Sequence, residues 1–391
     1  ERITYVPKHL QMVAVNQERT SFSEEAGFFK RLRRNRNLKI LDFVPNEFDK
    51  VPSFPSGYTY PYVERVRLPV VCCDDRLKSF LQTKSLKALS FSFEGKNYTD
   101  AEKKIPLLCS LLAKNAPYLV ELSVEVEIVK EKDVLVFMTL SQLERLQSLT
   151  IWVRVHSLKY FSFLKDMNLE RFELQLKYDA KLSEESVDIL SESTSHFTKL
   201  KTLAFKIEIN RFETNDKIDA KLALFLCQFK TVEDMTLHAD GRLIEKFIKQ
   251  VRSPGYVRLD IANERYQLIT IGDLLTKCHK LISLELNTEC TEAFQKNFVK
   301  GFNKIHQKLK KLDLSFYVTG EVDFQGLILK LKEMINVETL HLHFTDLEDS
   351  MINIVFKMIM RLPRLRSLRF SVNHSNAAGY QYFFENIQES I

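Results

Sequence analysis

A short apolar motif that recurs along the chain constrains its fold more than any other feature. Each copy has apolar residues at its first, fourth and sixth positions, as in Leu281, Leu284 and Leu286. Fourteen copies occur, about 27 residues apart on average, and the last three steps, which end at Leu365, are each 28 residues long. A regular step of this length predicts an array in which every unit packs on its neighbours rather than on one central core.

The segments between the copies have the pattern of amphipathic helices. In the last of them, Ile352, Val355, Phe356 and Ile359 recur at the spacing of one helical face. Each unit is therefore expected to contain a strand, a turn, a helix and a return. Helices are predicted at residues 101–114, 184–195, 218–229, 292–307, 324–334 and 349–360.

Together, the motif and the helices resemble the longer repeats of leucine-rich-repeat proteins, such as the ribonuclease-inhibitor-like proteins and the arrays of F-box receptors. The resemblance implies an α/β leucine-rich-repeat solenoid, curved like a horseshoe, with a parallel sheet on the concave face and helices on the convex face. It also implies that Leu284, Leu312, Leu340 and Leu368 lie side by side in one buried column.

The resemblance also divides the chain into three parts. Residues 1–37 are expected to form a first, degenerate repeat and a basic helix, residues 38–375 an array of about 13 units, and residues 376–391 a closing helix. The Asn or Cys that usually stands three positions after each motif is mostly replaced, for example by Glu289 and Tyr317. Because that side chain normally satisfies backbone groups, the turns after the strands are expected to be irregular.

Alternation along each strand identifies the side chains that face solvent on the concave side. In each copy we take the residue between the last two apolar residues and the residue just after them. Acidic side chains outnumber basic ones six to three at these positions, although the whole chain has a net charge of +6. A mixed, slightly acidic face favours a protein partner over nucleic acid, which needs clustered Lys and Arg with aromatic residues for stacking. The predicted partner-binding residues are Glu125, Trp152, Glu173, Gln175, Lys206, His238, Asp260, Glu285, Asp313, His341, His343 and Arg369.

Trp152 is the only tryptophan of the chain. An exposed tryptophan is a common hot spot of protein interfaces, and the motif places Trp152 on the concave face. If the fifth repeat is shifted along the strand, Trp152 belongs to the core instead. Both interpretations are compatible with the sequence.

A basic cluster near the N-terminus consists of Lys30, Arg31, Arg33, Arg34 and Arg36. Such a cluster can contact an acidic protein, RNA or an anionic lipid. A solvated face of an outer helix also explains it, and the pattern favours that simpler interpretation.

The sequence lacks the short motifs of common catalytic and cofactor sites. Phosphate-binding glycine loops, zinc-protease motifs and serine-hydrolase motifs are missing, so no catalytic residue, cofactor, metal or small-molecule substrate is expected. His341 and His343 share a strand face, but a metal site requires a third ligand. The six cysteines have no paired spacing, which predicts reduced thiols in an intracellular protein. No apolar run reaches the ~20 residues of a transmembrane segment.

We therefore predict a non-enzymatic protein-interaction scaffold, or a structural subunit of a larger assembly, that binds through the concave sheet face or the ends of the array. One alternative is the substrate-recognition subunit of a ubiquitin ligase, an F-box-type receptor whose N-terminal module is absent from this sequence. It rests on the family resemblance alone. The other alternative is a nucleic-acid-associated subunit that makes its contacts through the basic N-terminal helix.

Overall fold

The computed structural model forms two compact units, unit 1 (Glu1–Leu200) and unit 2 (Lys201–Ile391). The described residues are 11–16, 35–44, 62–68, 86–93, 98–126, 134–177, 182–207, 216–252, 254–318, 324–345, 347 and 349–372. The predicted closing helix at 376–391 and most of residues 1–37 lie outside these ranges.

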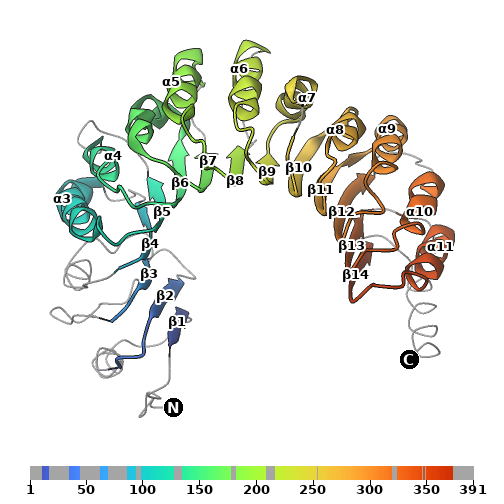
Figure 1. The fold of residues 1–391 in the computed structure, drawn as a ribbon, viewed down its shortest axis with the longest axis horizontal. Helices are drawn as coiled ribbons and strands as arrows, with labels where there is room; N and C mark the ends of the chain where they lie inside the picture. The colour runs from blue at the N-terminus through green and yellow to red at the C-terminus, as the bar shows by residue number, and fades with distance from the viewer. Residues whose placement is uncertain are drawn as a thin grey trace. The chain divides into compact units, whose positions relative to one another are not determined.

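The described part of unit 1 contains a parallel sheet whose strands follow one another in chain order. Its strands are β1 (Met12–Asn16), β2 (Ile40–Val44), β3 (Arg65–Leu68), β4 (Ala88–Phe93), β5 (Glu121–Val126), β6 (Ser148–Arg154) and β7 (Arg171–Lys177). The helices of this unit stand on one side of the sheet (Figure 1). They are α3 (Tyr98–Asn115), α4 (Val134–Leu140), the 3-10 helix η3 (Val155–Asp166) and α5 (Glu184–Thr194).

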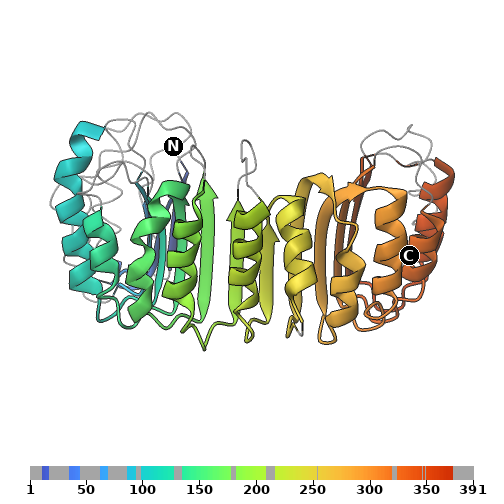
Figure 2. The same cartoon turned by 90° about the horizontal axis from the view of Figure 1, so that it is seen from above.

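Unit 2 repeats this arrangement, and its strands are again parallel and in chain order. Its strands are β8 (Thr202–Ile207), β9 (Asp234–His238), β10 (Arg258–Gln267), β11 (Ser283–Cys290), β12 (Lys311–Val318), β13 (Thr339–Phe344) and β14 (Ser367–Val372). Its helices are α6 (Asp216–Cys227), α7 (Gly241–Gln250), α8 (Ile271–Lys277), α9 (Glu292–Phe302), α10 (Gln325–Leu331) and α11 (Asp349–Ile359). They also stand together on one side of their sheet (Figures 1 and 2).

The apolar motif residues line up across neighbouring strands, as predicted. In unit 2, Leu284 pairs with Leu312, Leu312 with Leu340, and Leu340 with Leu368. The first three are fully buried, whereas Leu368 on β14 is half-buried. The same column of unit 1 contains Leu41, Val66, Leu89, Leu122, Leu149 and Phe172, all buried. Parallel strands stacked in this register, each followed by a helix or return on the same side, make the fold a leucine-rich-repeat solenoid.

The spacing of the two layers explains why the strands of each unit lie on its inner side. Paired strands lie about 4.8 Å apart, whereas packed helices need about 8–10 Å between their axes. Within each unit the helices therefore spread along the outer side and the sheet occupies the inner side (Figure 1). All six segments predicted as helices are helical, and four further intervals contain α4, α7, α8 and η3.

Phenylalanine side chains fill the space between sheet and helices in unit 2. Phe294, Phe298 and Phe302 lie one helical turn apart on α9, with ring centroids 5.5 and 5.2 Å apart. Phe316 of β12 packs edge-on against Phe294 at 5.6 Å. All four rings are buried. Since burying one such side chain contributes about 1.5–3 kcal/mol, this stripe holds α9 on the sheet.

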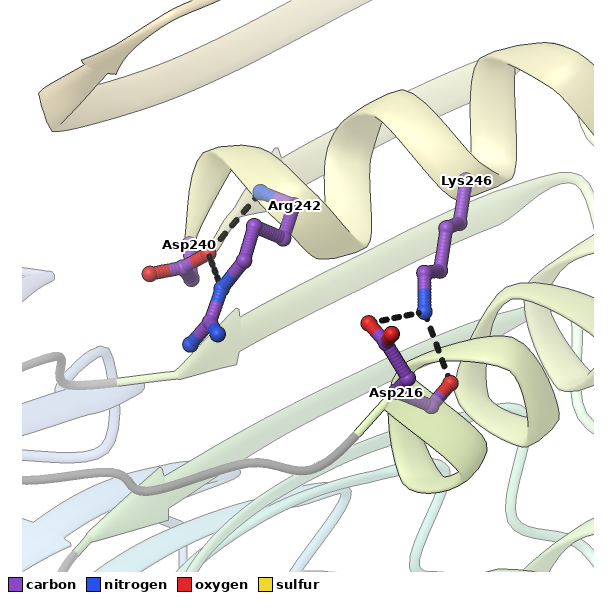
Figure 3. Close-up of polar contacts among 4 residues, drawn as sticks. All are labelled: Asp216, Asp240, Arg242 and Lys246. Carbon is purple, nitrogen blue, oxygen red and sulfur yellow. Dashed lines mark hydrogen bonds and ion pairs between the residues drawn. The ribbon is translucent and has the colours of Figure 1, made fainter.

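Polar contacts on the helix side join α7 to α6 (Figure 3). Asp240 caps α7, because its carboxylate accepts the backbone N–H of Arg242 at 2.8 Å. Lys246 of α7 donates to the backbone oxygen and to the carboxylate of Asp216 at the start of α6, at 2.7 and 2.9 Å. Hydrogen bonding to this ammonium group holds the pKa of Asp216 below its usual value. Such exposed contacts fix the positions of helix ends more than they stabilise the fold.

Candidate binding surfaces

The face of each sheet that points away from the helices is called the open face. On β11, Ser283, Glu285 and Asn287 lie on this face and alternate with the buried Leu284 and Leu286. We name three rows after this example. The first row contains the residue just before the middle apolar residue of each motif, the second row the residue between the last two apolar residues, and the third row the residue just after them.

The second row of unit 2 brings together five of the predicted site residues. They are Asp260, Glu285, Asp313, His341 and Arg369, in register on five adjacent strands. Paired residues of neighbouring strands are about 4.8 Å apart, so the three carboxylates stand side by side. Like charges in this arrangement repel each other unless cations lie near them.

Each of these carboxylates has a nitrogen atom from another strand beside it. The pairs are Asp260 Oδ1 with His238 Nε2 at 3.1 Å, Glu285 Oε2 with Lys311 Nζ at 3.2 Å, and Asp313 Oδ2 with His341 Nδ1 at 2.8 Å. The side chains of these pairs are between 22% and 45% exposed. Contacts between neighbouring strands therefore fix these side chains in position, and the side chains are still accessible to solvent.

The third row of unit 2 contains the other predicted residues, Lys206, His238 and His343. Lys206 pairs in register with His238 on the next strand. His343 Nδ1 lies 2.7 Å from the hydroxyl of Ser371. His341 and His343 thus turn to different neighbours, one to a carboxylate and one to a hydroxyl. Within the described ranges, no group of three or more His, Cys, Asp and Glu side chains could hold a metal ion.

The predicted residues of unit 1 lie at the end of its sheet nearest to β7. Glu125, Trp152 and Gln175 are in register in the third row, and Glu173 lies in the second row. Trp152 is half-buried, whereas its strand neighbours Ile151 and Val153 are 0% and 1% exposed. The indole side chain therefore lies on the face opposite to the core.

The first row was not among the predicted site residues, although the same alternation places it on the open face. In unit 1 this row contains Met12, Ile40, Arg65, Ala88, Glu121, Ser148 and Arg171. In unit 2 it contains Thr202, Asp234, Arg258, Ser283, Lys311, Thr339 and Ser367. The signal that could have found them is their position two residues before the second row. The first rows contain more basic than acidic side chains, so they add positive charge to the open faces.

The first two rows of unit 1 surround a hollow of about 330 Å³ on the open face. Arg65, Arg67 and Arg171 line it, together with Glu121 and the hydroxyl-bearing residues of the central strands. Arg65 Nη2 lies 2.9 Å from Glu121 Oε2. The hollow concentrates arginine on a face for which the sequence predicted a slight excess of acid.

The basic cluster near the N-terminus falls largely outside the described residues. Lys30, Arg31, Arg33 and Arg34 are not among them. Arg36 is exposed in the turn that precedes β2. The contribution of this cluster to binding therefore stays a proposal.

The described cysteines Cys109, Cys227, Cys278 and Cys290 are free thiols, and the last two are buried. Burial raises the pKa of Cys227 to about 11 and that of Cys278 and Cys290 to about 12. These thiols therefore stay protonated near neutral pH.

No helix among the described residues combines the length and the apolar character that a membrane span requires.

Comparisons with known proteins give similarities to solved structures only. No family model matches the sequence, and neither does any curated protein. The chain is similar to a structure of the Rad7 and Elc1 complex in yeast, with 15% identity, 92% of this chain and 86% of that chain covered, and a TM-score of 0.42. It is also similar to a TLR13–ssRNA13 complex, with 15% identity, coverage of 93% and 57%, and a TM-score of 0.38. A leucine-rich-repeat protein of Leptospira interrogans is similar at 12% identity, with coverage of 95% and 83% and a TM-score of 0.31. The fold assignment rests on the strand register described above.

Proposed function

We propose that the chain is a non-enzymatic scaffold, or a structural subunit of a larger assembly, that holds a protein partner on the open faces of its sheets. The observation that carries this proposal is the second row of unit 2. There Asp260, Glu285 and Asp313 stand on adjacent strands, each within 2.8–3.2 Å of a histidine or lysine nitrogen. Acidic and basic groups interleaved in this way complement a protein surface, where charges of both signs also alternate.

The contacts within the row also favour tight binding. A side chain that is already held by its neighbour loses less conformational entropy when a partner covers it. The partly exposed His341–Asp313 pair keeps hydrogen-bonding capacity for such a partner, because a carboxylate accepts several bonds. An open face of this kind needs to bury about 800 Å² to hold one partner stably.

Trp152 belongs to a separate proposed surface, on the open face of unit 1. It stands in the third row of unit 1 between Glu125 and Gln175, with Glu173 in the neighbouring row. A partly exposed aromatic ring among polar side chains is the usual composition of a hot spot and its rim. We expect Trp152→Ala to weaken partner binding by about 2 kcal/mol or more if this ring is covered in the complex.

Quantitative affinity purification tests the proposal with a pair of matched charge reversals. We expect Glu285→Lys with Asp313→Lys to lose the specific partners of the wild-type chain, because the row would then carry like charges. Glu292→Lys is the control, since Glu292 is exposed on α9 and, within the described part of the chain, pairs with its helix neighbour Lys296 in an i,i+4 contact at 2.6 Å.

The result is decided by which partners each variant retains. Loss in the double variant and retention in the Glu292 variant support binding through the open face. If the double variant, folded by circular dichroism, kept the full set of wild-type partners, the open face of unit 2 would not be the binding surface.

The basic cluster is proposed as a separate contact for an anionic partner. Reversal of Arg31, Arg33 and Arg34 to Glu tests it, and added salt is expected to weaken such a contact strongly.

We also propose an intracellular location, because buried thiols such as Cys278 and Cys290 are free. Alkylation of protein taken directly from cells would test whether these thiols are reduced.

A further inference from the structure

The hollow on the open face of unit 1 has a regular construction. All six first-row residues from β2 to β7 line it, and the second-row residues Arg67, Ser90, Ser123 and Thr150 form the rest of its polar wall. The hollow therefore belongs to the sheet itself and not to a loop. Neighbouring strands hold its walls in register by backbone hydrogen bonds.

The side chain of Arg65 extends into this hollow over Ala88, its neighbour in the row on the next strand. The small side chain of Ala88 leaves room for the guanidinium group to pass. The guanidinium group of Arg65 reaches across Ala88 to the second strand along, where Nη2 lies 3.1 and 2.9 Å from the two carboxylate oxygens of Glu121. A guanidinium group has five N–H donors, so one carboxylate at Nη2 does not exhaust it.

The hydrogen-bond donors of the lining indicate the chemistry of its ligand. Its described residues include three arginines and one glutamate, and Arg65 and Arg171 each have a carboxylate within 4.0 Å. The hydroxyl groups of Ser90, Ser123, Ser148 and Thr150 add neutral donors around the arginines. A phosphate monoester carries about −1.5 to −2 at neutral pH and offers three acceptor oxygens, so it can accept from several of these donors at once.

We propose that this hollow binds a phosphorylated serine or threonine side chain of a protein partner. Arginine recognises phosphate through paired N–H groups, and here guanidinium groups come from both sides of the hollow. An unmodified acidic side chain has one negative charge and only two acceptor oxygens, so it engages fewer of these donors. The site therefore distinguishes the phosphorylated from the unphosphorylated form of the same segment.

The surroundings of the hollow are unfavourable for a nucleic acid strand. A strand carries a phosphate at every nucleotide and needs basic residues along its whole path, with aromatic rings for the bases. The described residues of the lining include no aromatic side chain. Beyond it, in the next positions of the open face, stand the acidic Glu125 and Glu173.

Fluorescence anisotropy with the full chain tests the proposal. The probes are fluorescein-labelled degenerate peptide pools with a fixed central phosphoserine, serine or glutamate, and a single-stranded RNA of random sequence. We expect the phosphoserine pool to bind at least about tenfold more tightly than the other three probes, as charge-assisted hydrogen bonds to arginine predict. Inorganic phosphate should compete, and added salt should weaken binding. Trp152, the only tryptophan, follows Thr150 by two residues on the same strand face and provides a second, intrinsic signal.

Three variants separate a binding site from a structural effect. Arg171→Gln is expected to weaken phosphoserine binding about tenfold. Arg258→Gln is the matched control, because Arg258 occupies the first row in unit 2 and its side chain is at least as exposed as that of Arg171. The Arg258→Gln chain should bind the phosphoserine pool as tightly as the wild type does. Glu121→Gln removes the carboxylate that competes for Arg65 and should tighten binding, a gain that misfolding cannot produce.

The proposal is overturned if the phosphoserine and serine pools bind alike, if folded Arg171→Gln binds like the wild type, or if Glu121→Gln does not tighten binding. RNA bound more tightly than the phosphoserine pool, with the same sensitivity to Arg171→Gln, would assign the hollow to nucleic acid and refute the proposal. The inference rests on the proposed use of the open faces for protein binding, but the two fail separately. If the Glu285 and Asp313 reversals abolish partner capture while the peptide pools bind alike, only the phosphate site is wrong.

Discussion

Two glycines allow helices α8 and α9 of unit 2 to approach each other at backbone distance, and alanine at either position tests this contact. A Cβ atom on Gly272 would lie 1.9 Å from the backbone oxygen of Asn297, and one on Gly301 would lie 2.2 Å from the backbone oxygen of Gly272. Real Cβ atoms essentially never come within 3.0 Å of such an atom. Gly272→Ala must therefore push the two helices apart by about 1 Å, because backbone atoms cannot rotate away.

The expected loss of stability follows from three contributions. Overpacking of a close contact costs about 1–3 kcal/mol. The N–H of Gly272 donates a 2.6 Å hydrogen bond to Oδ1 of Asn297, and weakening it adds about 1 kcal/mol. The higher helix propensity of alanine offsets up to about 1 kcal/mol. We expect Gly272→Ala to lower the free energy of unfolding by about 2 kcal/mol, and the melting temperature by about 4–8 °C.

Gly326 provides the control for this substitution. It lies in α10 of the same unit, and a Cβ atom there would meet nothing within 4 Å. Gly326→Ala should therefore raise stability, by up to about 1 kcal/mol, because alanine loses less backbone entropy than glycine in a helix.

Urea unfolding followed by circular dichroism measures both variants, and hydrogen exchange locates the effect. Faster exchange is expected in the peptides that cover α8 and α9, because each repeat packs on its immediate neighbours. A Gly272→Ala chain with the wild-type midpoint would refute the reasoning. Equal destabilisation by Gly326→Ala would also refute it, since the cost would then come from losing glycine and not from the contact.

Three further predictions follow from single sites. Phe298→Ala should lower stability by about 3–5 kcal/mol because it empties the centre of the α9 aromatic stack, and urea unfolding would show this as a lower midpoint. Burial raises the pKa of Cys278 to about 12, so iodoacetamide at pH 8 should label it only after unfolding; mass spectrometry reads the labelled fraction, and rapid labelling of the folded chain would contradict the burial. Hydrogen bonds from Lys39 and Lys87 hold the pKa of Glu64 below its usual 4.5. The pairing therefore stabilises the fold above pH 4.5, and this stabilisation is lost as the pH falls through the pKa of the folded state. Glu64→Gln should therefore lower the melting temperature slightly at pH 7 and by less as the pH falls below 4.5, and a difference that does not shrink with falling pH would count against it.

The sequence alone determined the repeat architecture of this protein. The motif step places each strand beside the next, and two-residue alternation decides which side chains are buried. Both properties are local, so the column of Leu284, Leu312 and Leu340 could be predicted residue by residue. The helix at α9 was also predictable, because its apolar residues recur with the period of a helix.

The same alternation could have placed the first row on the open face, but not the contacts that its side chains make. Arg65 and Glu121 are 56 residues apart in the chain, and they meet only because strand register aligns them and Ala88 leaves space between them. The backbone approach of Gly272 to Gly301 likewise depends on how far apart two helices come to rest. Tertiary structure decided these features because the reach of a side chain, and the room available for it, depend on residues that are distant in sequence.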